Sequence, residues 1–274
     1  MRAWIACAAA LALGFSAQAG FQWVTALDWS PLGELLLISA EGALWVGRAP
    51  TGAEAYRVTP ENSWVNWGRF GPEGDWFVYV TPVEDGFSLW KGWLQGGEPE
   101  ELFHSETLIS QPAVAPDGTR IAFIGEQDGQ PDLFLLDLTT GETHRLTNTP
   151  FPEACPDFSP DGTFLAFVGL WTDGGTSWDL FLLDLTTDSF QQLTDDPFFD
   201  WYPRFSPDGE WIAFESNRGG QSDIYVIRQD GGEVIPFTYD EWRDGFPAWS
   251  PDGEEIAYVK RKPSGWVILV EGAY

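Results

Sequence analysis

The stretch Pro203-Arg204-Phe205-Ser206-Pro207-Asp208-Gly209 decides the fold, because versions of it recur six times along the chain. Four copies keep an intact Pro-Asp-Gly, and the first two are degenerate. The six glycines are separated by 41, 44, 44, 47 and 44 residues, and they are Gly33, Gly74, Gly118, Gly162, Gly209 and Gly253. A period in the low forties with several short strands per unit is the spacing of a propeller blade. The sequence therefore predicts an all-β, six-bladed β-propeller.

Each unit is predicted to contain four short antiparallel strands. In the fourth unit the first strand ends near Ser159, and Pro160-Asp161-Gly162 makes a tight turn into the second strand at 164–168. Proline presets the first corner of such a turn, and glycine accepts the positive φ that closes it. Third strands such as Leu180-Phe181-Leu182-Leu183 are apolar on both faces, which indicates strands covered by neighbouring sheets. No stretch has sustained helical periodicity, so we expect almost no helix.

The two ends of the chain are predicted to share the last blade. The sixth unit supplies three strands and then the sequence stops. The segment Phe21-Gln22-Trp23-Val24-Thr25 is similar to the fourth strands of other units, which end in Leu-Thr or Val-Thr. We expect this N-terminal strand to complete the last blade and to close the ring without an open edge.

Residues 1–19 are predicted to be a cleaved export signal. Arg2 gives a positive start, and the apolar run 3–14 is too short to span a bilayer. Ala17-Gln18-Ala19 then offers a small-x-small cleavage site. Residues 20–274 are expected to form a single propeller domain that is periplasmic or secreted, monomeric, and without an integral membrane segment.

The charge of the chain restricts its partners. The formal net charge is −28, with 42 acidic and 14 basic residues. Such a surface repels phosphate backbones and anionic membranes, which argues against nucleic acid as a ligand. Basic protein patches or divalent ions fit better, although plain solubility or adaptation to salty or hot surroundings explains the charge equally well. Only Cys155 lies outside the signal, so no internal disulfide is expected, and we interpret it as a small buried apolar residue.

The repeat resembles the TolB-type, WD40-like β-propeller repeat, also called PD40. That family's pattern is matched by 203–209, by Ile212-Ala213-Phe214 and by Asp223-Ile224-Tyr225. The resemblance covers most of the chain after the signal and implies the propeller fold. Two departures are the degenerate first two units and the lack of room for the separate domain that precedes the propeller in TolB. The resemblance therefore implies a free-standing, exported TolB-like propeller.

Ligand sites of propellers usually lie on the face whose loops lead into the first strands. By analogy with other propellers, we expect a ligand site on the same face here. Counting from the threonine that ends each fourth strand, the sixth residue is acidic in three successive blades, at Glu153, Asp200 and Asp244, with Asp196 nearby. These acids either accept backbone hydrogen bonds between blades or bind a cationic group. No Asp-x-Asp-x-Asp-Gly loop is present, so we expect no cofactor, with calcium as the alternative.

Aromatic residues share these loops and the longest loop between second and third strands. Exposed rings beside carboxylates suit peptides with basic and apolar groups, and they also suit sugars. Packing between blades is the other interpretation of the same residues. The candidates for a partner-binding face are Trp64, Trp171, Trp178, Trp201 and Trp242.

Motifs for catalysis are missing from the sequence. The two histidines, His104 and His144, lie near predicted outer strands, and no Gly-x-Ser-x-Gly, His-Glu-x-x-His or Gly-rich phosphate motif occurs. We expect no catalytic residue and no metal site. The prediction is a protein- or peptide-binding scaffold in the cell envelope that uses an acidic, aromatic loop face. The alternatives are a carbohydrate-binding or carbohydrate-active propeller, since two acids suffice for glycoside cleavage, and a structural part of a larger assembly.

Overall fold

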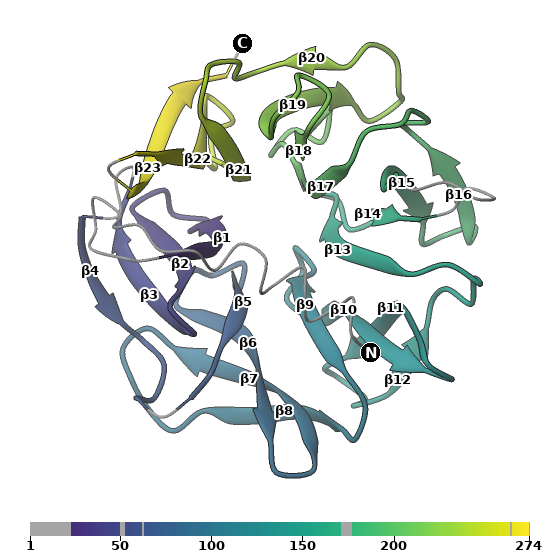
Figure 1. The fold of residues 1–274 in the computed structure, drawn as a ribbon. Coiled ribbons are helices and arrows are strands. Elements are labelled where there is room, and N and C mark those ends of the chain that lie inside the picture. The colour runs from purple at the N-terminus through teal and green to yellow at the C-terminus, as the bar shows by residue number, and fades with distance from the viewer. Residues whose placement is uncertain (1–22, 50–52, 62, 171–176, 264, 274) are drawn as a thin grey trace.

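The computed structural model describes residues 23–49, 53–61, 63–170, 177–263 and 265–273. In these ranges 23 strands form six antiparallel sheets, and no helix occurs. The sheets stand as blades around a central axis, with β1, β5, β9, β13, β17 and β21 nearest the centre (Figure 1). The prediction of an all-β, six-bladed propeller is confirmed.

Each sheet is built from consecutive strands that run up and down from the axis to the rim. The first blade contains β1 (Val24–Trp29), β2 (Leu35–Ala40), β3 (Ala43–Arg48) and β4 (Ala53–Arg57). The second contains β5 (Asn66–Phe70), β6 (Trp76–Val83), β7 (Gly86–Trp93) and β8 (Glu100–Ser105). The third contains β9 (Ile109–Val114), β10 (Arg120–Gln127), β11 (Gln130–Asp137) and β12 (Thr143–Arg145).

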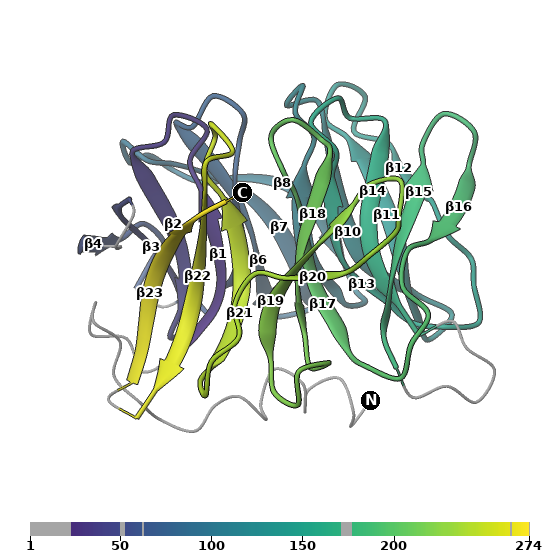
Figure 2. The ribbon, with the colours of Figure 1, turned by 90° about the horizontal axis from the view of Figure 1, so that it is seen from above.

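The other three blades follow the same order. The fourth contains β13 (Glu153–Phe158), β14 (Phe164–Gly169), β15 (Asp179–Asp184) and β16 (Ser189–Gln192). The fifth contains β17 (Asp200–Phe205), β18 (Trp211–Ser216), β19 (Asp223–Arg228) and β20 (Ile235–Pro236). The sixth contains β21 (Arg243–Trp249), β22 (Glu255–Lys262) and β23 (Gly265–Gly272). Viewed from the side, the loops that lead into the first strands gather on the lower face of the molecule, here called the loop face (Figure 2).

The Pro-Asp-Gly turns form as expected on the opposite face. Gly162 has φ 71°, and its N–H donates to the Ser159 carbonyl at 2.8 Å. The Ser159 hydroxyl and the Thr163 N–H both donate to Asp161 Oδ1, at 2.6 and 3.0 Å. These hydrogen bonds hold the pKa of Asp161 below its usual range. The aspartate of this motif therefore stabilises the first hairpin of the blades that keep an intact Pro-Asp-Gly.

The hydrophobic core lies between neighbouring blades, which explains why the second and third strands are apolar on both faces. Between the third and fourth blades, for example, Leu133 of β11 packs in one cluster with Phe158, Phe167 and Phe181. The Phe167 and Phe181 rings stack with their centroids 5.6 Å apart. Each such interface covers the sheet faces from water, and the ring of blades repeats this arrangement around the axis.

The predicted closure of the last blade is wrong for the residues that the structure describes. Val24 and Thr25 lie in β1, where Val24 pairs with Ala40, while Phe21 and Gln22 lie outside the described residues. The last sheet has three strands, β21, β22 and β23. The reason is that alternate residues of this segment, Val24 and Ala26, are buried and fit an innermost strand. The ring closes instead by packing, in a cluster that joins Val24, Leu27 and Trp29 to Phe246, Ala248 and Trp266.

Candidate binding site at the channel mouth

A bulge interrupts the first strand of five blades at the same position. In β13, for example, the pairing with β14 shifts register between Ala154 and Asp157. The bulged residue has a left-handed backbone, with φ between 51° and 57°, yet it is never glycine; the five are Trp67, Gln111, Cys155, Tyr202 and Phe246. Such backbone costs on the order of 1–3 kcal/mol per residue, and it concentrates at functional sites. Bulges also change the direction of a side chain, so this repeated feature marks a candidate site.

The bulged residues line a recess at the axis, here called the channel mouth, to which all six blades contribute. The recess measures about 20 Å³ and is lined by Ala26, Trp67, Arg69, Gln111, Pro112, Cys155, Tyr202, Arg204 and Phe246. The Tyr202 and Phe246 rings lie 4.6 Å apart. Gln111 connects two blades, because its Oε1 accepts from the Cys155 N–H at 2.8 Å. The channel mouth is therefore a packed ring of aromatic and amide side chains.

A layer of charges lies next to this ring, two residues further along each first strand. The six equivalent positions are Asp28, Arg69, Ala113, Asp157, Arg204 and Ala248, so a three-blade pattern occurs twice around the axis. Arg204 Nη1 lies 3.1 Å from Asp157 Oδ1 and 3.7 Å from Asp28 Oδ1. Arg204 Nη2 also donates to the Leu27 carbonyl at 2.7 Å. The charged layer therefore links blades that lie far apart in the sequence.

The two aspartates of this layer are held in equivalent ways. The Phe70 N–H donates to Asp28 Oδ2 at 2.8 Å, and the Phe205 N–H donates to Asp157 Oδ2 at 2.9 Å, each from the following blade. Burial raises the pKa of Asp28 to about 6 and that of Asp157 to about 7, although the nearby Arg69 charge acts in the opposite direction. Both carboxyls are therefore able to gain a proton close to neutral pH.

The aligned trio of acids occupies equivalent positions, as predicted, but lies between blades. Glu153, Asp200 and Asp244 are 0%, 0% and 1% exposed. Glu153 Oε2 accepts from the Leu133 N–H of the preceding blade at 3.2 Å. Both Asp200 oxygens accept from Arg218 Nη2 at 3.1 Å, and Asp244 pairs with Lys260 at 3.1 Å. Glu153 thus bonds across a blade interface, whereas Asp200 and Asp244 pair with basic side chains of their own blades, and all three acids are buried.

A second buried carboxylate, at the start of a third strand, accompanies each member of the trio. These residues are Asp132, Asp179 and Asp223, and the sequence reasoning missed them. Asp179, Asp196 and Asp200 offer oxygens within 4.8 Å of one another. Arg218 Nη2 lies 3.2 Å from Asp196 and 3.1 Å from Asp200, so a guanidinium already balances this cluster. The sequence pattern that could have identified these three residues is an aspartate directly before the apolar run of a third strand.

Comparison with known proteins assigns the chain to a family. The family model described as "TolB beta propeller domain" matches residues 77–271. The chain belongs to the TolB β-propeller family. The Tol-Pal system protein TolB of Methylococcus capsulatus is 30% identical over 108 residues, which are 38% of this chain and 26% of that protein. The chain thus aligns with about a quarter of the length of this curated relative.

Two solved structures extend the likeness of this TolB-type propeller in fold. The structure assigned to TolB of Agrobacterium tumefaciens has a TM-score of 0.75 and 23% identity, covering 92% of this chain and 91% of that one. An oligogalacturonate lyase in complex with manganese has a TM-score of 0.63 and 15% identity, covering 90% of this chain and 76% of that one. At these identities the two structures support the fold alone.

The predicted aromatic candidates of the TolB-type propeller differ in exposure. Trp64 is 58% exposed, whereas Trp178, Trp201 and Trp242 are half-buried, and Trp171 lies outside the described residues. The Trp178 and Trp201 rings lie 4.6 Å apart and pack together. The sequence reasoning did not single out the channel mouth, although its members stand three residues before the residue that ends each first strand.

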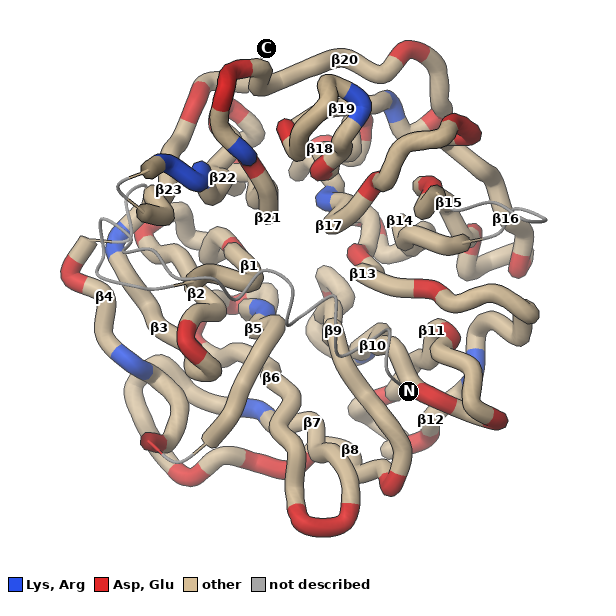
Figure 3. The backbone as a smooth tube through the Cα atoms, viewed as in Figure 1, with Lys and Arg blue, Asp and Glu red and all other residues tan. Residues whose placement is uncertain are grey.

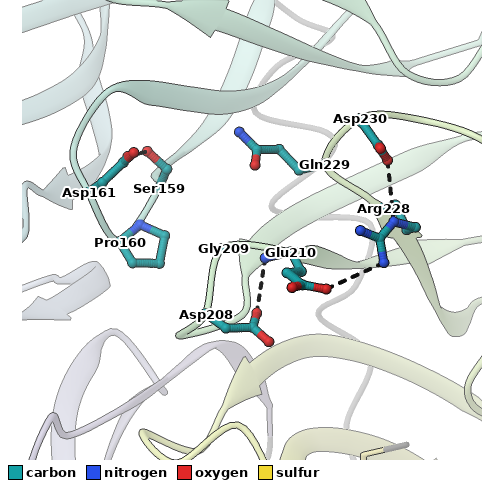
Figure 4. Close-up of a pocket in the computed structure, with 9 residues that line it drawn as sticks. All are labelled: Ser159, Pro160, Asp161, Asp208, Gly209, Glu210, Arg228, Gln229 and Asp230. Atoms are coloured by element: carbon teal, nitrogen blue, oxygen red, sulfur yellow. Dashed lines mark hydrogen bonds and ion pairs between the residues drawn. The ribbon is translucent and has the colours of Figure 1, made fainter.

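A pocket on the opposite face is a weaker candidate. It measures about 290 Å³, lies between the fourth and fifth blades, and is lined by the residues labelled in Figure 4. Its charged groups satisfy one another, because Arg228 lies 3.4 Å from both Glu210 and Asp230, and the Ser159 hydroxyl donates to Asp161. This pocket is built from turns that the fold itself requires.

The cysteine and the two histidines lie where the sequence predicted. Cys155 is buried, with 4% of its surface exposed, as the sequence predicted. His104 and His144 lie in the outer strands β8 and β12, far from the channel mouth. Within the described residues no helix has the length and apolar character needed to cross a bilayer.

Proposed function

We propose that this TolB-type propeller is an exported, non-enzymatic scaffold that binds a protein or peptide of the cell envelope. The binding face is the channel mouth together with the loops around it. The observation that carries the proposal is the ring of five non-glycine residues in left-handed backbone, one in each blade from the second to the sixth. Trp67 and Tyr202 in this ring are half-buried and keep part of their surface exposed, and Trp and Tyr are among the residue types that dominate binding energy at protein interfaces. Because bulges fix their backbone, little conformational freedom is lost on binding.

The chemistry of the partner follows from the charge around the channel mouth. Figure 3 shows acidic segments all around the ring and few basic ones. Exposed acids in the loops that lead into the first strands include Glu61, Glu106, Asp195, Asp240 and Glu241. A partner with apolar side chains and a basic rim would be attracted to this face. The predicted export signal and the name of the Methylococcus relative support a place in the envelope.

A pull-down from envelope extract tests the proposal. The double variant Trp67→Ala/Tyr202→Ala is expected to lose the captured protein, with an affinity decrease of about 100-fold, because two ring anchors are truncated. The matched control is Tyr56→Ala, whose side chain is 50% exposed on the outer strand β4, and it should capture normally. Equal capture by both variants, each with the melting temperature of the unmodified protein, would disprove the proposed face.

Carbohydrate binding is the second candidate function. The fold likeness to an oligogalacturonate lyase favours it, as do the aromatic rings next to Arg69 and Arg204 at the channel mouth. Aromatic faces stack on sugars, and guanidinium groups pair with carboxylates such as those of uronic acids. A glycan array tests this alternative. Carbohydrate binding replaces the first proposal if the unmodified protein binds a glycan, the double variant does not, and the pull-down captures no protein.

A further inference from the structure

The sixth blade differs from the other five in the part of the chain that the structure describes. It has three strands, whereas each of the others has four. The outermost strand of this blade is β23 (Gly265–Gly272), which Figure 1 shows in yellow at the rim of the ring. One long edge of β23 pairs with β22 along its whole length, and no described strand pairs with the other edge.

The sequence of β23 is that of a covered strand. Its centre is Trp266-Val267-Ile268-Leu269-Val270, an apolar run without charge or proline. The centres of the third strands β11, β15 and β19 have the same apolar character, and in each of these blades a fourth strand pairs with the outer edge. Outer strands are different, as in β16, where all four residues are exposed and two are glutamine. Edge strands of proteins usually carry charges, proline or bulges that prevent further pairing, and the centre of β23 has none of the three.

The backbone groups of β23 have an equivalent in the other blades. In β19, Ile224 donates its N–H to Thr238 Oγ1 at 3.0 Å and accepts from the Phe237 N–H at 2.8 Å. Leu44, Leu133 and Leu180 make the same two bonds to the two residues that shortly follow the fourth strand of their blade. Ile268 occupies this register position, because it pairs with Val259 as Ile224 pairs with Glu215. The N–H and C=O of Ile268, and of Val270 two residues on, therefore face the open edge.

The charge at one end of this edge is unusual for the molecule. Arg243 of β21 pairs with Arg261 of β22 at the loop-face end of the blade, and Lys262 follows Arg261. Figure 3 shows basic segments beside β22 and β23. The Arg261 guanidinium lies over the Trp266 ring, 5.8 Å from its centroid. A basic group on a chain of net charge −28 attracts an acidic segment. The other end carries the exposed Glu271.

We propose that the open edge of β23 binds an extended strand of a second protein. The strand runs antiparallel to β23, takes the place of a fourth strand, and carries acidic side chains where it passes Trp266 and the basic group. Main-chain hydrogen bonds to Ile268 and Val270 provide affinity, as in other cases of strand addition. The acidic end fixes the direction of the strand. This surface is separate from the channel mouth, so its test does not depend on the proposed function.

A peptide with the sequence of this chain's residues 187–196 is a suitable probe. It contains the outer strand of the fourth blade and ends in Asp195-Asp196, the acidic end that the proposal requires. Amide hydrogen exchange measured by NMR should show Ile268 and Val270 exchanging rapidly in the free protein. Millimolar peptide should slow both amides about tenfold, and a scrambled peptide should not. Arg261→Glu/Lys262→Glu should weaken the effect several-fold.

Variants at Val270 separate hydrogen bonding from packing. Val270→Pro removes one N–H from the open edge, and proline is tolerated there because that N–H makes no bond within the sheet. The variant should abolish the protection of the Ile268 amide by the peptide. Val270→Ala keeps the N–H and should retain it. The proposal is overturned if Ile268 and Val270 are already protected in the free protein, since another segment or a second copy then covers the edge. It is equally overturned if the peptide leaves exchange unchanged.

Discussion

Replacing Arg204 with alanine is expected to lower the free energy of unfolding by about 3–5 kcal/mol, the usual cost of removing one partner from a buried charge network. The Arg204 side chain is 9% exposed, and it contacts Asp157, Asp28 and the Leu27 carbonyl at once. Its loss removes the closer of the two arginines that act on these aspartates, and it breaks a contact between the fifth blade and the first. For a chain of this size the melting temperature should fall by roughly 10 °C.

The matched control for this variant is Arg228→Ala. Arg228 is also flanked by two acids, Glu210 and Asp230, but its side chain is 46% exposed. Exposed ion pairs contribute at most about 1 kcal/mol, so this variant should unfold within a few degrees of the unmodified protein. Thermal and urea unfolding of both variants measure the difference. Equal destabilisation would mean that the charged layer at the axis does not hold the blades together.

Stability should increase as the pH is lowered from 8 to about 5, which is the second large effect. Burial raises the pKa of seven carboxyls to about 6 or 7; they are Asp28, Glu153, Asp157, Asp179, Glu215, Asp223 and Asp244. In the unfolded chain these groups have pKa values near 4. Between about pH 4 and 7 the folded protein therefore binds more protons than the unfolded chain, and stability is lost as pH rises through this window.

Four aspartates with lowered pKa values limit this increase in stability at low pH. Asp117, Asp161, Asp208 and Asp252 of the Pro-Asp-Gly turns have pKa values below their usual range, because nearby hydroxyl and N–H groups donate to them. Their contribution is lost as pH falls below about 4, so maximum stability is expected between about pH 4 and 5. Melting temperatures across the range measure this profile. Asp157→Asn should flatten it between pH 5 and 7, and a maximum at pH 8 would contradict it.

Much of the fold could be predicted because turn chemistry is local. Proline and glycine in Pro-Asp-Gly set backbone angles regardless of the rest of the chain, so the blade count and the hairpins followed from spacing. The N-terminal segment was misplaced because the sequence Val24-Thr25 matches the residues that end the fourth strands of other blades. The place of the segment is explained by the burial of Val24 against Phe246 and Trp266, which are far from it in the sequence.

The candidate site was harder to predict for two physical reasons. A bulge adds a residue to one strand, so side-chain direction after it no longer follows simple alternation, and Tyr202 and Phe246 could not be assigned to the axis by pattern alone. Exposure of the acidic trio depended on neighbours such as Arg218 and Lys260, which come from other strands or loops of the same blades as Asp200 and Asp244. The alignment of the trio was visible in the sequence, whereas its burial required the packed interfaces.

Photo-crosslinking from the channel mouth tests the central claim most directly. A photoreactive amino acid placed at position 202 in the exported protein should form one dominant adduct with an envelope protein. The same amino acid at position 56, on the outer strand of the first blade, should not form it. Identical adducts from both positions, or no protein adduct from position 202, would contradict recognition through the channel mouth.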